Sequence, residues 1–451
     1  MNDQPFFLRC IRESCQQEFD ITQKLYQCPA CLDLLDIAYN FPKFDGTQIR
    51  ETFRQRKASR NPLDLSGVWR YREFLPFAQK DLSNVITLGE GNSPILETPK
   101  SADYVGLKHL RVKHLGWNPS GSFKDHGMTV GLSQAKVLDS RVVACASTGN
   151  TSSSMAAYCA RAGIRAVVFI PEGQIAYGKL AQTLDYGATT IQLEGDFDVA
   201  MSLVQELSEE TDLYLMNSIN PFRLEGQKTV ILELFDQLDW KIPDRIVVPG
   251  GNLGNSSSYG KALMELKQLG LIDKIPRITI IQASGADPLY RTLVTSSKEL
   301  VPVSNAWTLA SAIKIGKPIS WKKALRSLNF TDGWCDVANE QEIADAKAIL
   351  GRDGIGCEPA SATTIAGLKK LLESSEHGAS VDPDEDIIVI LTGHQLKDPE
   401  YTINYHLDNL YQHAIYENLI TEKSGKLTSA FANPPIPMAA NKEDIVRLLD
   451  L

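Results

Sequence analysis

A lysine at the start of a predicted helix is the first candidate for covalent chemistry. Lys124 follows a turn-forming run in the segment N-P-S-G-S-F-K-D-H-G at 118–127. The positive end of a helix dipole and nearby amide groups lower the pKa of a lysine there and favour its neutral amine. The neutral amine is the form that attacks an aldehyde. On spacing alone a solvent-exposed surface lysine is the favoured alternative, so Lys124 is a candidate nucleophile only.

A glycine-rich loop between a predicted strand and a predicted helix is a candidate phosphate cradle. The loop residues are Gly250, Gly251, Asn252, Leu253, Gly254 and Asn255. Glycines let successive backbone N–H groups surround a phosphate, and the helix N-terminus adds favourable charge. A dinucleotide-binding loop has the spacing G-x-G-x-x-G, whereas this run is G-G-x-x-G. A tight strand-to-helix turn without a ligand remains the structural alternative.

Two further loops carry polar side chains at the ends of predicted strands. The run S-T-G-N-T at 147–151 offers hydroxyls, an amide and free N–H groups to a carboxylate or a ring oxygen. It also fits a cluster of helix caps. Thr392 follows the apolar run 387–391, and ligands of open α/β sheets bind beyond the carboxyl ends of strands. The neighbouring His394 can equally be structural.

Four of the eight cysteines fall within the first 31 residues, at Cys10, Cys15, Cys28 and Cys31. Four thiolates at these spacings can build a tetrahedral structural zinc site. The first spacing is four residues rather than two, so a metal-free remnant and a redox pair remain alternatives. The other four cysteines are predicted to lie in packed interior positions.

The elements that must position these residues alternate along the chain. Short apolar runs predict strands at 142–146, 166–170, 189–193, 245–248, 278–281 and 387–391. Helices are predicted between them at 152–162, 177–186, 197–209 and 256–269. This alternation is typical of parallel α/β architecture. A small module is expected at 1–45, followed by a linker at about 46–65.

Composition places the chain among folded globular proteins. It has 451 residues, 43% of them hydrophobic and 22% charged, which excludes a collagen, a coiled coil and a disordered tail. At about 150 residues per domain, roughly three domains are expected. The net charge of -9 disfavours nucleic-acid binding, and it means that an anionic ligand needs a local basic pocket. Neither a long apolar stretch nor a signal sequence is visible, so a cytoplasmic location without membrane contact is expected.

Taken together, the motifs resemble those of pyridoxal-phosphate enzymes of the tryptophan-synthase-β fold type and, within them, the threonine synthase family. The runs that carry this resemblance appear in the family's order over about 65–400. They are L-G-E-G-N-S-P at 88–94, N-P-S-G-S-F-K-D at 118–125, S-T-G-N-T at 147–151, N-S-I-N-P-F-R-L-E-G-Q-K at 217–228, G-G-N-L-G-N at 250–255 and T-G-H-Q-L-K-D-P at 392–399. The glycine loop is shared across the fold type and is the least diagnostic of them.

The resemblance implies a role for each matching residue. Lys124 would hold pyridoxal 5'-phosphate as an aldimine and move protons. Asn150 would contact the ring hydroxyl, Gly250 to Asn255 the cofactor phosphate, and Thr392 the pyridine nitrogen. The substrate's carboxylate or phosphate would meet Ser147, Thr148 and Thr151. A basic pocket for the substrate phosphate would consist of Lys179, Asn217, Ser218 and Arg223.

The implied reaction converts O-phospho-L-homoserine and water to L-threonine and phosphate. A serine/threonine dehydratase or another β-replacement enzyme is the alternative of the same fold type. A non-catalytic metabolite sensor is an alternative of another class, but it has no use for Lys124. Two residues depart from the family's pattern. His126 stands in place of the usual arginine, which puts in doubt a supporting contact beside Lys124. Gln395 stands in place of a common glycine, which puts in doubt the conformation of a loop near the ring.

The resemblance also implies an architecture. It consists of two three-layer parallel-sheet domains with the cofactor between them, preceded by a small zinc-ribbon-like module. We expect this module at 1–45 and a linker with the first part of the large domain at 46–117. The small α/β domain would span 118–240, and the rest of the large domain with a C-terminal extension 241–451. Members of the family are commonly homodimers.

Overall fold

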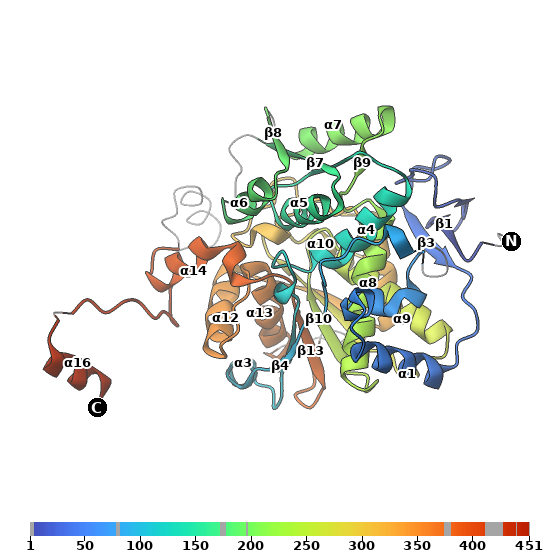
Figure 1. Ribbon diagram of the computed structural model, residues 1–451. Coiled ribbons are helices and arrows are strands. Elements are labelled where there is room, and N and C mark those ends of the chain that lie inside the picture. Colours follow the sequence, from blue (N-terminus) through green and yellow to red (C-terminus); the bar gives the residue numbers. More distant parts are fainter. Residues whose placement is uncertain are drawn as a thin grey trace.

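The computed structural model describes residues 4–77, 82–171, 177–194, 197–373, 380–410, 427–438 and 440–450. Its strands form three sheets of three, six and four strands (Figure 1). The three-stranded sheet belongs to the N-terminal module and has the order β2-β1-β3. Its strands are β1 (Phe6–Cys10), β2 (Glu18–Phe19) and β3 (Leu35–Tyr39), and all pairs are antiparallel.

The segment expected to be a linker is helical instead. It contains α1 (Gly46–Lys57) and α2 (Pro62–Leu65). Asp45 caps α1 by accepting hydrogen bonds from the backbone N–H groups of Thr47 and Gln48. Only two apolar residues at helical spacing, Ile49 and Phe53, face the main core, where both are buried. Because the rest of the stretch is mostly charged or polar, the helix was not predicted.

Short elements connect these helices to the first core strand. They are the 3-10 turns η1 (Trp69–Phe74), η2 (Leu82–Asn84) and η3 (Leu115–Trp117), the strands β4 (Ile95–Glu97) and β5 (Arg111–His114), and the helix α3 (Pro99–Val105).

The four-stranded sheet has the order β8-β7-β6-β9 and is parallel throughout. Its strands are β6 (Val142–Ala146), β7 (Arg165–Pro171), β8 (Thr189–Leu193) and β9 (Tyr214–Leu215). The helices of this part are α4 (Lys124–Val137), α5 (Asn150–Ala162), α6 (Tyr177–Asp185), α7 (Phe197–Glu210) and α8 (Pro221–Gln237). The strands predicted here from apolar runs agree with the structure to within one residue at each end.

The six-stranded sheet has the order β12-β11-β10-β13-β5-β4, and only its edge strand β4 is antiparallel. The strands from the second half of the chain are β10 (Arg245–Pro249), β11 (Arg277–Ala283), β12 (Trp334–Ala338) and β13 (Ile387–Leu391). The helices and turns that follow are α9 (Gly254–Gln268), α10 (Pro288–Val294), η4 (Ser311–Ile313), α11 (Trp321–Thr331), α12 (Glu340–Arg352), α13 (Pro359–Glu373), η5 (Gln395–Lys397), α14 (Pro399–His406) and α16 (Lys442–Leu449).

Both faces of the six-stranded sheet are buried. In β10, Ile246 and Val248 belong to one apolar cluster, whereas Val247 belongs to the cluster on the opposite face. Because both faces are covered, β10, β11 and β13 read as largely apolar runs, and this made them visible in the sequence, whereas β4, β5 and β12 were not predicted. The α/β fold class with a cysteine-bearing N-terminal module is confirmed. The domain boundaries remain a prediction.

The C-terminal part runs outward from the body to α16, which buries none of its residues (Figure 1). Its stretch Pro434–Pro437 is exposed. None of the helices in the described part of the chain has the length and apolarity that crossing a bilayer requires.

Candidate active site

The loop before α4 and the loop after β13 are joined, and this junction fixes Lys124. The backbone N–H of Phe123 donates to the carbonyl of Thr392 over 2.9 Å, and that of His394 donates to Gly121 over 2.9 Å. Lys124 is the first residue of α4, and Thr392 directly follows β13. The predicted nucleophile therefore lies beside the carboxyl end of the strand that was expected to face the ring.

The amine of Lys124 is half-buried and has an altered pKa. Its Nζ lies 3.7 Å from the ring centroid of Phe123. Burial is the largest cause that lowers the pKa of Lys124 to about 7, and the charge of Arg223 lowers it further, against the raising effect of Glu358. From the sequence, the helix dipole was expected to lower this pKa. In the structure, burial and the neighbouring arginine are the larger causes.

Glu358 connects several of the predicted site residues, although no role was predicted for it. This carboxylate is 1% exposed. It accepts a hydrogen bond from Asn150 Nδ2 over 2.9 Å and one from Thr392 Oγ1 over 3.3 Å. The ammonium of Lys179 lies 3.9 Å from the same carboxylate. A single buried acid therefore brings together residues from α5, α6 and the loop after β13.

The side chain of Asn150 retains an unused acceptor. Asn150 is the first residue of α5 and is buried, and its Oδ1 has no hydrogen-bond partner. Thr392 is also buried, and its hydroxyl shares a 3.0 Å hydrogen bond with the Ser361 hydroxyl. Because buried polar atoms are nearly always paired in folded proteins, this free Oδ1 is an acceptor that a ligand could use.

The glycine loop leads into the N-terminus of α9, as predicted. The backbone of Leu253 is left-handed at φ 63°, and α9 begins at Gly254. A Cβ on Gly250 would lie 2.6 Å from Ile280 Cγ2, so close packing against β11 requires glycine there. Asn255 donates from Nδ2 to the carbonyl of Pro249 over 3.0 Å and holds the loop closed. The first N–H groups of α9 are free of helical partners and suit an anion.

Arg223 is a buried cation near Lys124. It is 2% exposed, and its guanidinium donates to the carbonyl of Met216 over 2.8 Å and to Thr151 Oγ1 over 3.4 Å. Its Nε has no partner, and it makes no ion pair with any residue that the structure describes. Burial lowers the pKa of Arg223 to about 10.

The other members of the predicted basic pocket are arranged differently. Lys179 is already paired with Asp398 over 2.9 Å and donates to Ser311 over 2.8 Å. Asn217 uses both ends of its amide on the backbone of Ala146, accepting over 3.0 Å and donating over 2.9 Å. It thereby holds the end of β6, from which the loop 147–151 starts. Ser218 is half-buried next to it.

The loop 147–151 is shaped by a hydrogen bond within it. The hydroxyl of Ser147 accepts from the N–H of Gly149 over 3.1 Å. Thr148 and Thr151 are half-buried, and Thr151 faces Arg223 through the contact described above. Hydroxyls and a guanidinium thus meet beside the start of α5, where an anionic substrate group would find several donors.

These residues fit pyridoxal phosphate. An amine with a lowered pKa can bond to an aldehyde, a helix start with a glycine loop can hold a phosphate, and the free Oδ1 of Asn150 can pair with a ring hydroxyl.

Sequence reasoning missed Glu358 and Lys397. Lys397 is buried and donates to the carbonyl of Ser120 over 2.8 Å and to Ser153 Oγ over 3.0 Å. The only sequence signal for Lys397 was its place in the run T-G-H-Q-L-K-D-P.

The four N-terminal cysteines lie together. Sγ of Cys10 is 3.4 Å from that of Cys31, and Sγ of Cys15 is 3.7 Å from that of Cys28. All four sulfur atoms lie within 4.8 Å of one another. A tetrahedral zinc–thiolate site with bonds of about 2.3 Å has its sulfur atoms about 3.8 Å apart, so the cluster has the size of such a site.

The sequence and the fold both match known proteins. The model of the family described as pyridoxal-phosphate dependent enzyme matches residues 86–393. The threonine synthase of Methanocaldococcus jannaschii is 46% identical over 396 residues, which cover 88% of this chain and 94% of that protein. The chloroplastic threonine synthase 2 of Arabidopsis thaliana is 36% identical over 426 residues, covering 92% and 79%.

Solved structures support the fold. Maize serine racemase has a TM-score of 0.59 at 22% identity, covering 74% of this chain and 94% of its own. A threonine deaminase from Solanum lycopersicum has a TM-score of 0.58 at 19% identity, covering 79% and 86%. At these identities the likeness concerns the fold alone. From the family match and the threonine synthase relatives, we conclude that the chain belongs to the pyridoxal-phosphate-dependent enzymes and, among them, to the threonine synthases.

Proposed function

We propose that this protein converts O-phospho-L-homoserine and water to L-threonine and phosphate, the last step of threonine biosynthesis. The observation that carries the proposal is Arg223, a buried guanidinium that pairs with no carboxylate of the described chain and lies beside Lys124 and Thr151. A buried charge is unfavourable unless it is paired. A substrate phosphate supplies that pair, whereas serine and threonine, the substrates of a dehydratase, bring no phosphate.

The chain's residues would bind the cofactor at three points. Gly250 to Asn255 with the start of α9 would hold its phosphate, Asn150 its ring hydroxyl, and Thr392 its pyridine nitrogen. When bound at Lys124, pyridoxal phosphate supplies the electron sink that makes the substrate's Cα and Cβ protons acidic. Thr392 offers the ring a hydroxyl whose hydrogen bonds to Ser361 and Glu358 fix its direction.

Lys124 would move the protons. A pKa of about 7 lets Nζ accept a proton near neutral pH and release it again, which is the condition for efficient general acid–base catalysis. The charge of Arg223 keeps this pKa low, and Glu358 prevents it from falling further. The next residue, Asp125, is held by hydrogen bonds from Ser120 and Ser154, and burial raises the pKa of its carboxyl to about 6.

The substrate would lie between the loop 147–151 and α8. Arg223 binds the phosphate that leaves from Cγ, since a guanidinium matches the geometry of phosphate oxygens. Ser147, Thr148 and Thr151 receive the carboxylate. Lys179 adds positive charge from α6, and Ser218 adds a hydroxyl. Asn217 acts by positioning the loop through Ala146.

Product analysis with the cofactor-loaded enzyme tests the proposal. We expect phosphate and L-threonine in equal amounts from O-phospho-L-homoserine, and neither product from Lys124→Ala, which also loses the visible absorption of the lysine-linked cofactor. The exposed substitution Lys274→Gln is the matched lysine control and should behave as wild type. Release of ammonia from serine or threonine, with no threonine from O-phospho-L-homoserine, would instead establish the dehydratase alternative.

We also propose that the four N-terminal cysteines hold one structural zinc ion, which the size of the sulfur cluster supports. The homodimer, the cytoplasmic location and the domain boundaries given above complete the proposal. Light scattering should give twice the mass of one chain, and a monomeric mass would contradict the dimer.

A further inference from the structure

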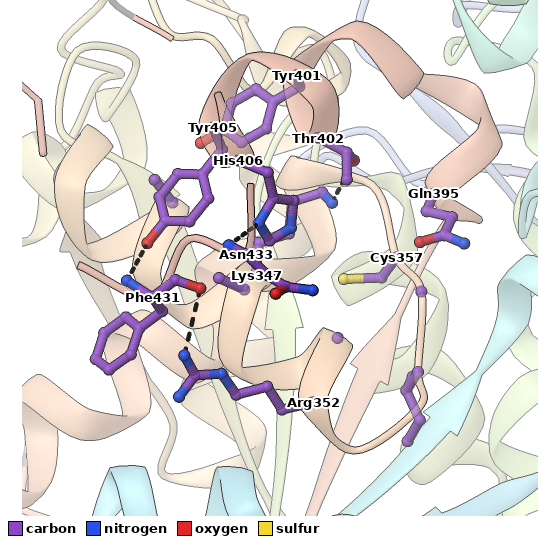
Figure 2. Close-up of a pocket in the computed structure, with 15 residues that line it drawn as sticks. Lys347, Arg352, Cys357, Gln395, Tyr401, Thr402, Tyr405, His406, Phe431 and Asn433 are labelled. Carbon is purple, nitrogen blue, oxygen red and sulfur yellow. Dashed lines mark hydrogen bonds between the residues drawn. The ribbon is translucent and has the colours of Figure 1, made fainter. Parts of the chain in front are cut away.

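A cavity lies against α12 and α14, apart from the residues assigned to the cofactor and the substrate. Its volume is about 270 Å³, and its wall includes α12, the segment Ile355–Cys357, Gln395, α14 and the residues Phe431 and Asn433 (Figure 2). None of the residues assigned above to the cofactor or the substrate lines it. It is therefore a separate site.

The wall of this cavity contains two basic side chains and no acidic one. Its charged side chains are Lys347 and Arg352, and it contains neither Asp nor Glu. Lys347 is 8% exposed and donates to Thr402 Oγ1 over 2.7 Å. Its Nζ lies 6.0 Å from the ring centroid of Tyr401, and burial has the largest effect on its pKa, lowering it against the raising charge of Asp398. Because it forms no ion pair with any residue in the described ranges, it retains donors for a ligand. Such a group is unfavourable in an empty pocket and favourable beside an anion.

The rest of the wall suits a small, partly apolar molecule. Ala344, Ala348, Ile355 and the ring of Phe431 form apolar surface. Tyr401 is buried, and its hydroxyl has no hydrogen-bond partner. Arg352 lies at the exposed end, where it donates to the carbonyl of Phe431 over 3.4 Å (Figure 2). Ligand pockets usually start at about 300 Å³, so only one small molecule fits.

The cavity shares two chain segments with the active site. Cys357 lines the cavity, and the next residue, Glu358, holds Asn150 and Thr392. Gln395 lines the cavity, and its N–H donates to the carbonyl of Gly356 over 3.3 Å. Two residues further on, Lys397 holds the loop before Lys124 through Ser120. A molecule that moves either segment would therefore move residues of the active site.

We propose that this cavity binds a small monocarboxylate, with its carboxylate on Lys347 and Arg352, and that the bound molecule alters substrate binding through the segments 356–358 and 395–397. The binding part of this inference stands without the proposed function. The effector part rests on it, because it is measured with O-phospho-L-homoserine.

Calorimetry with benzoate and its neutral isostere benzamide tests the binding part on the cofactor-loaded enzyme. We expect benzoate to bind and benzamide to bind about tenfold more weakly, since only the carboxylate pairs with the lysine. Lys347→Met should weaken benzoate binding about tenfold or more, and Arg352→Gln about threefold because this side chain is exposed. Lys274→Gln should change nothing.

Two further variants distinguish binding in this cavity from binding in the active site and from a structural role of Lys347. Arg223→Gln should leave benzoate binding intact, and loss of binding in this variant would place benzoate in the active site and overturn the proposal. Lys347→Met should melt no lower than wild type, because it removes a buried unpaired charge. A lower melting temperature with unchanged benzoate affinity would mean that Lys347 is structural and would also overturn the proposal. The exposed Arg352→Gln keeps the test valid if Lys347→Met fails to fold.

Kinetics tests the effector part. Benzoate should change the KM for O-phospho-L-homoserine in wild type and have no effect on the KM of Lys347→Met. An unchanged KM at saturating benzoate overturns the effector role. Absence of turnover with intact benzoate binding would instead count against the proposed function alone, so the two failures are distinguishable.

Discussion

The amine of Lys124 shares its surroundings with two cations, Arg223 and Lys179, and one carboxylate, Glu358. Burial and the cations favour the neutral amine, and the carboxylate opposes them. This balance keeps the pKa near the pH at which the amine must both accept and release protons. The same balance makes the pKa of Lys124 adjustable by single substitutions that leave the lysine in place.

We predict the pH dependence of cofactor loading onto the cofactor-free protein. Only the neutral amine attacks the aldehyde, so the loading rate should rise with pH up to a midpoint of about 7 and level off above it. Arg223→Gln should move the midpoint up, because the removed cation no longer disfavours the ammonium. Glu358→Gln should move it down. The growth of the visible absorption after mixing measures the rate.

The exposed Lys274→Gln is the control and should keep the wild-type midpoint. A midpoint near the ordinary lysine value of 10.5, or shifts of the opposite sign in the two variants, would contradict these electrostatics of the site.

At this scale the sequence predicted the residues that lie in distinctive runs, namely Lys124, Asn150 and Thr392. It could not predict Glu358, because nothing in C-E-P-A-S at 357–361 marks a carboxylate that folds back onto two distant loops. Nor could it predict that Lys179 is paired with Asp398 while Arg223 has no such partner among the described residues, since pairing depends on tertiary contacts.

At the scale of elements, α4 and α8 approach each other closely next to the site. A Cβ on Gly226 in α8 would lie 1.7 Å from the backbone oxygen of His126 in α4. The glycine therefore sets the distance between the helix that carries Lys124 and the helix that carries Arg223. His126 is fully buried at this contact, and burial lowers its pKa to about 4.

We predict that Gly226→Ala destabilises the protein by about 3 kcal/mol or more, because the helices must separate. Gly351→Ala is the matched control, since nothing lies within 4 Å of the added Cβ near the end of α12. It should stabilise the protein by about 0.5–1 kcal/mol through helix propensity. Thermal unfolding of the two variants beside wild type measures the difference, and equal melting temperatures would contradict the close contact.

The strands β6, β7, β8, β10, β11 and β13 could be predicted as apolar runs, and the central strands β10 and β13 are buried on both faces. The strands β4, β5, β9 and β12 were not predicted. Helix α1 could not be predicted, since only Ile49 and Phe53 mark its buried side among many charges. The order in which the strands pair within each sheet could not be predicted from the sequence either. β5 joins β13 from the far end of the chain, and no local pattern encodes that register.

At the scale of the whole molecule, the cysteine module is docked onto the second half of the chain. Lys323 donates to the carbonyl of Leu35 over 2.7 Å, and Lys261 donates to that of Ile37 over 2.6 Å. Arg326 pairs with Asp36 over 2.6 Å. These contacts bind β3 to α9 and α11, two helices that pack against β11 of the six-stranded sheet. Unfolding of the cysteine module should therefore lower the stability of the rest of the protein.

We predict one zinc ion per chain, released by a chelator when the protein unfolds. Cys28→Ala should lose the zinc and lower the melting temperature by about 5 °C or more, since metal binding contributes directly to folding. Cys159→Ala, a substitution at a buried cysteine outside the cluster, should keep the zinc. A metal-free wild-type protein with the same melting temperature as Cys28→Ala would show that the cluster is a remnant.

The measurement that tests the central claim most directly is the steady-state kinetics of threonine formation from O-phospho-L-homoserine in wild type and Arg223→Gln. A charge-assisted bond to the substrate phosphate contributes about 1.5–3 kcal/mol. We therefore predict that kcat/KM falls by a factor of about 10–100, mainly through a higher KM, while the visible absorption of the bound cofactor stays intact. An unchanged KM in Arg223→Gln, or no threonine from wild type, would contradict the assignment of Arg223 to the substrate phosphate.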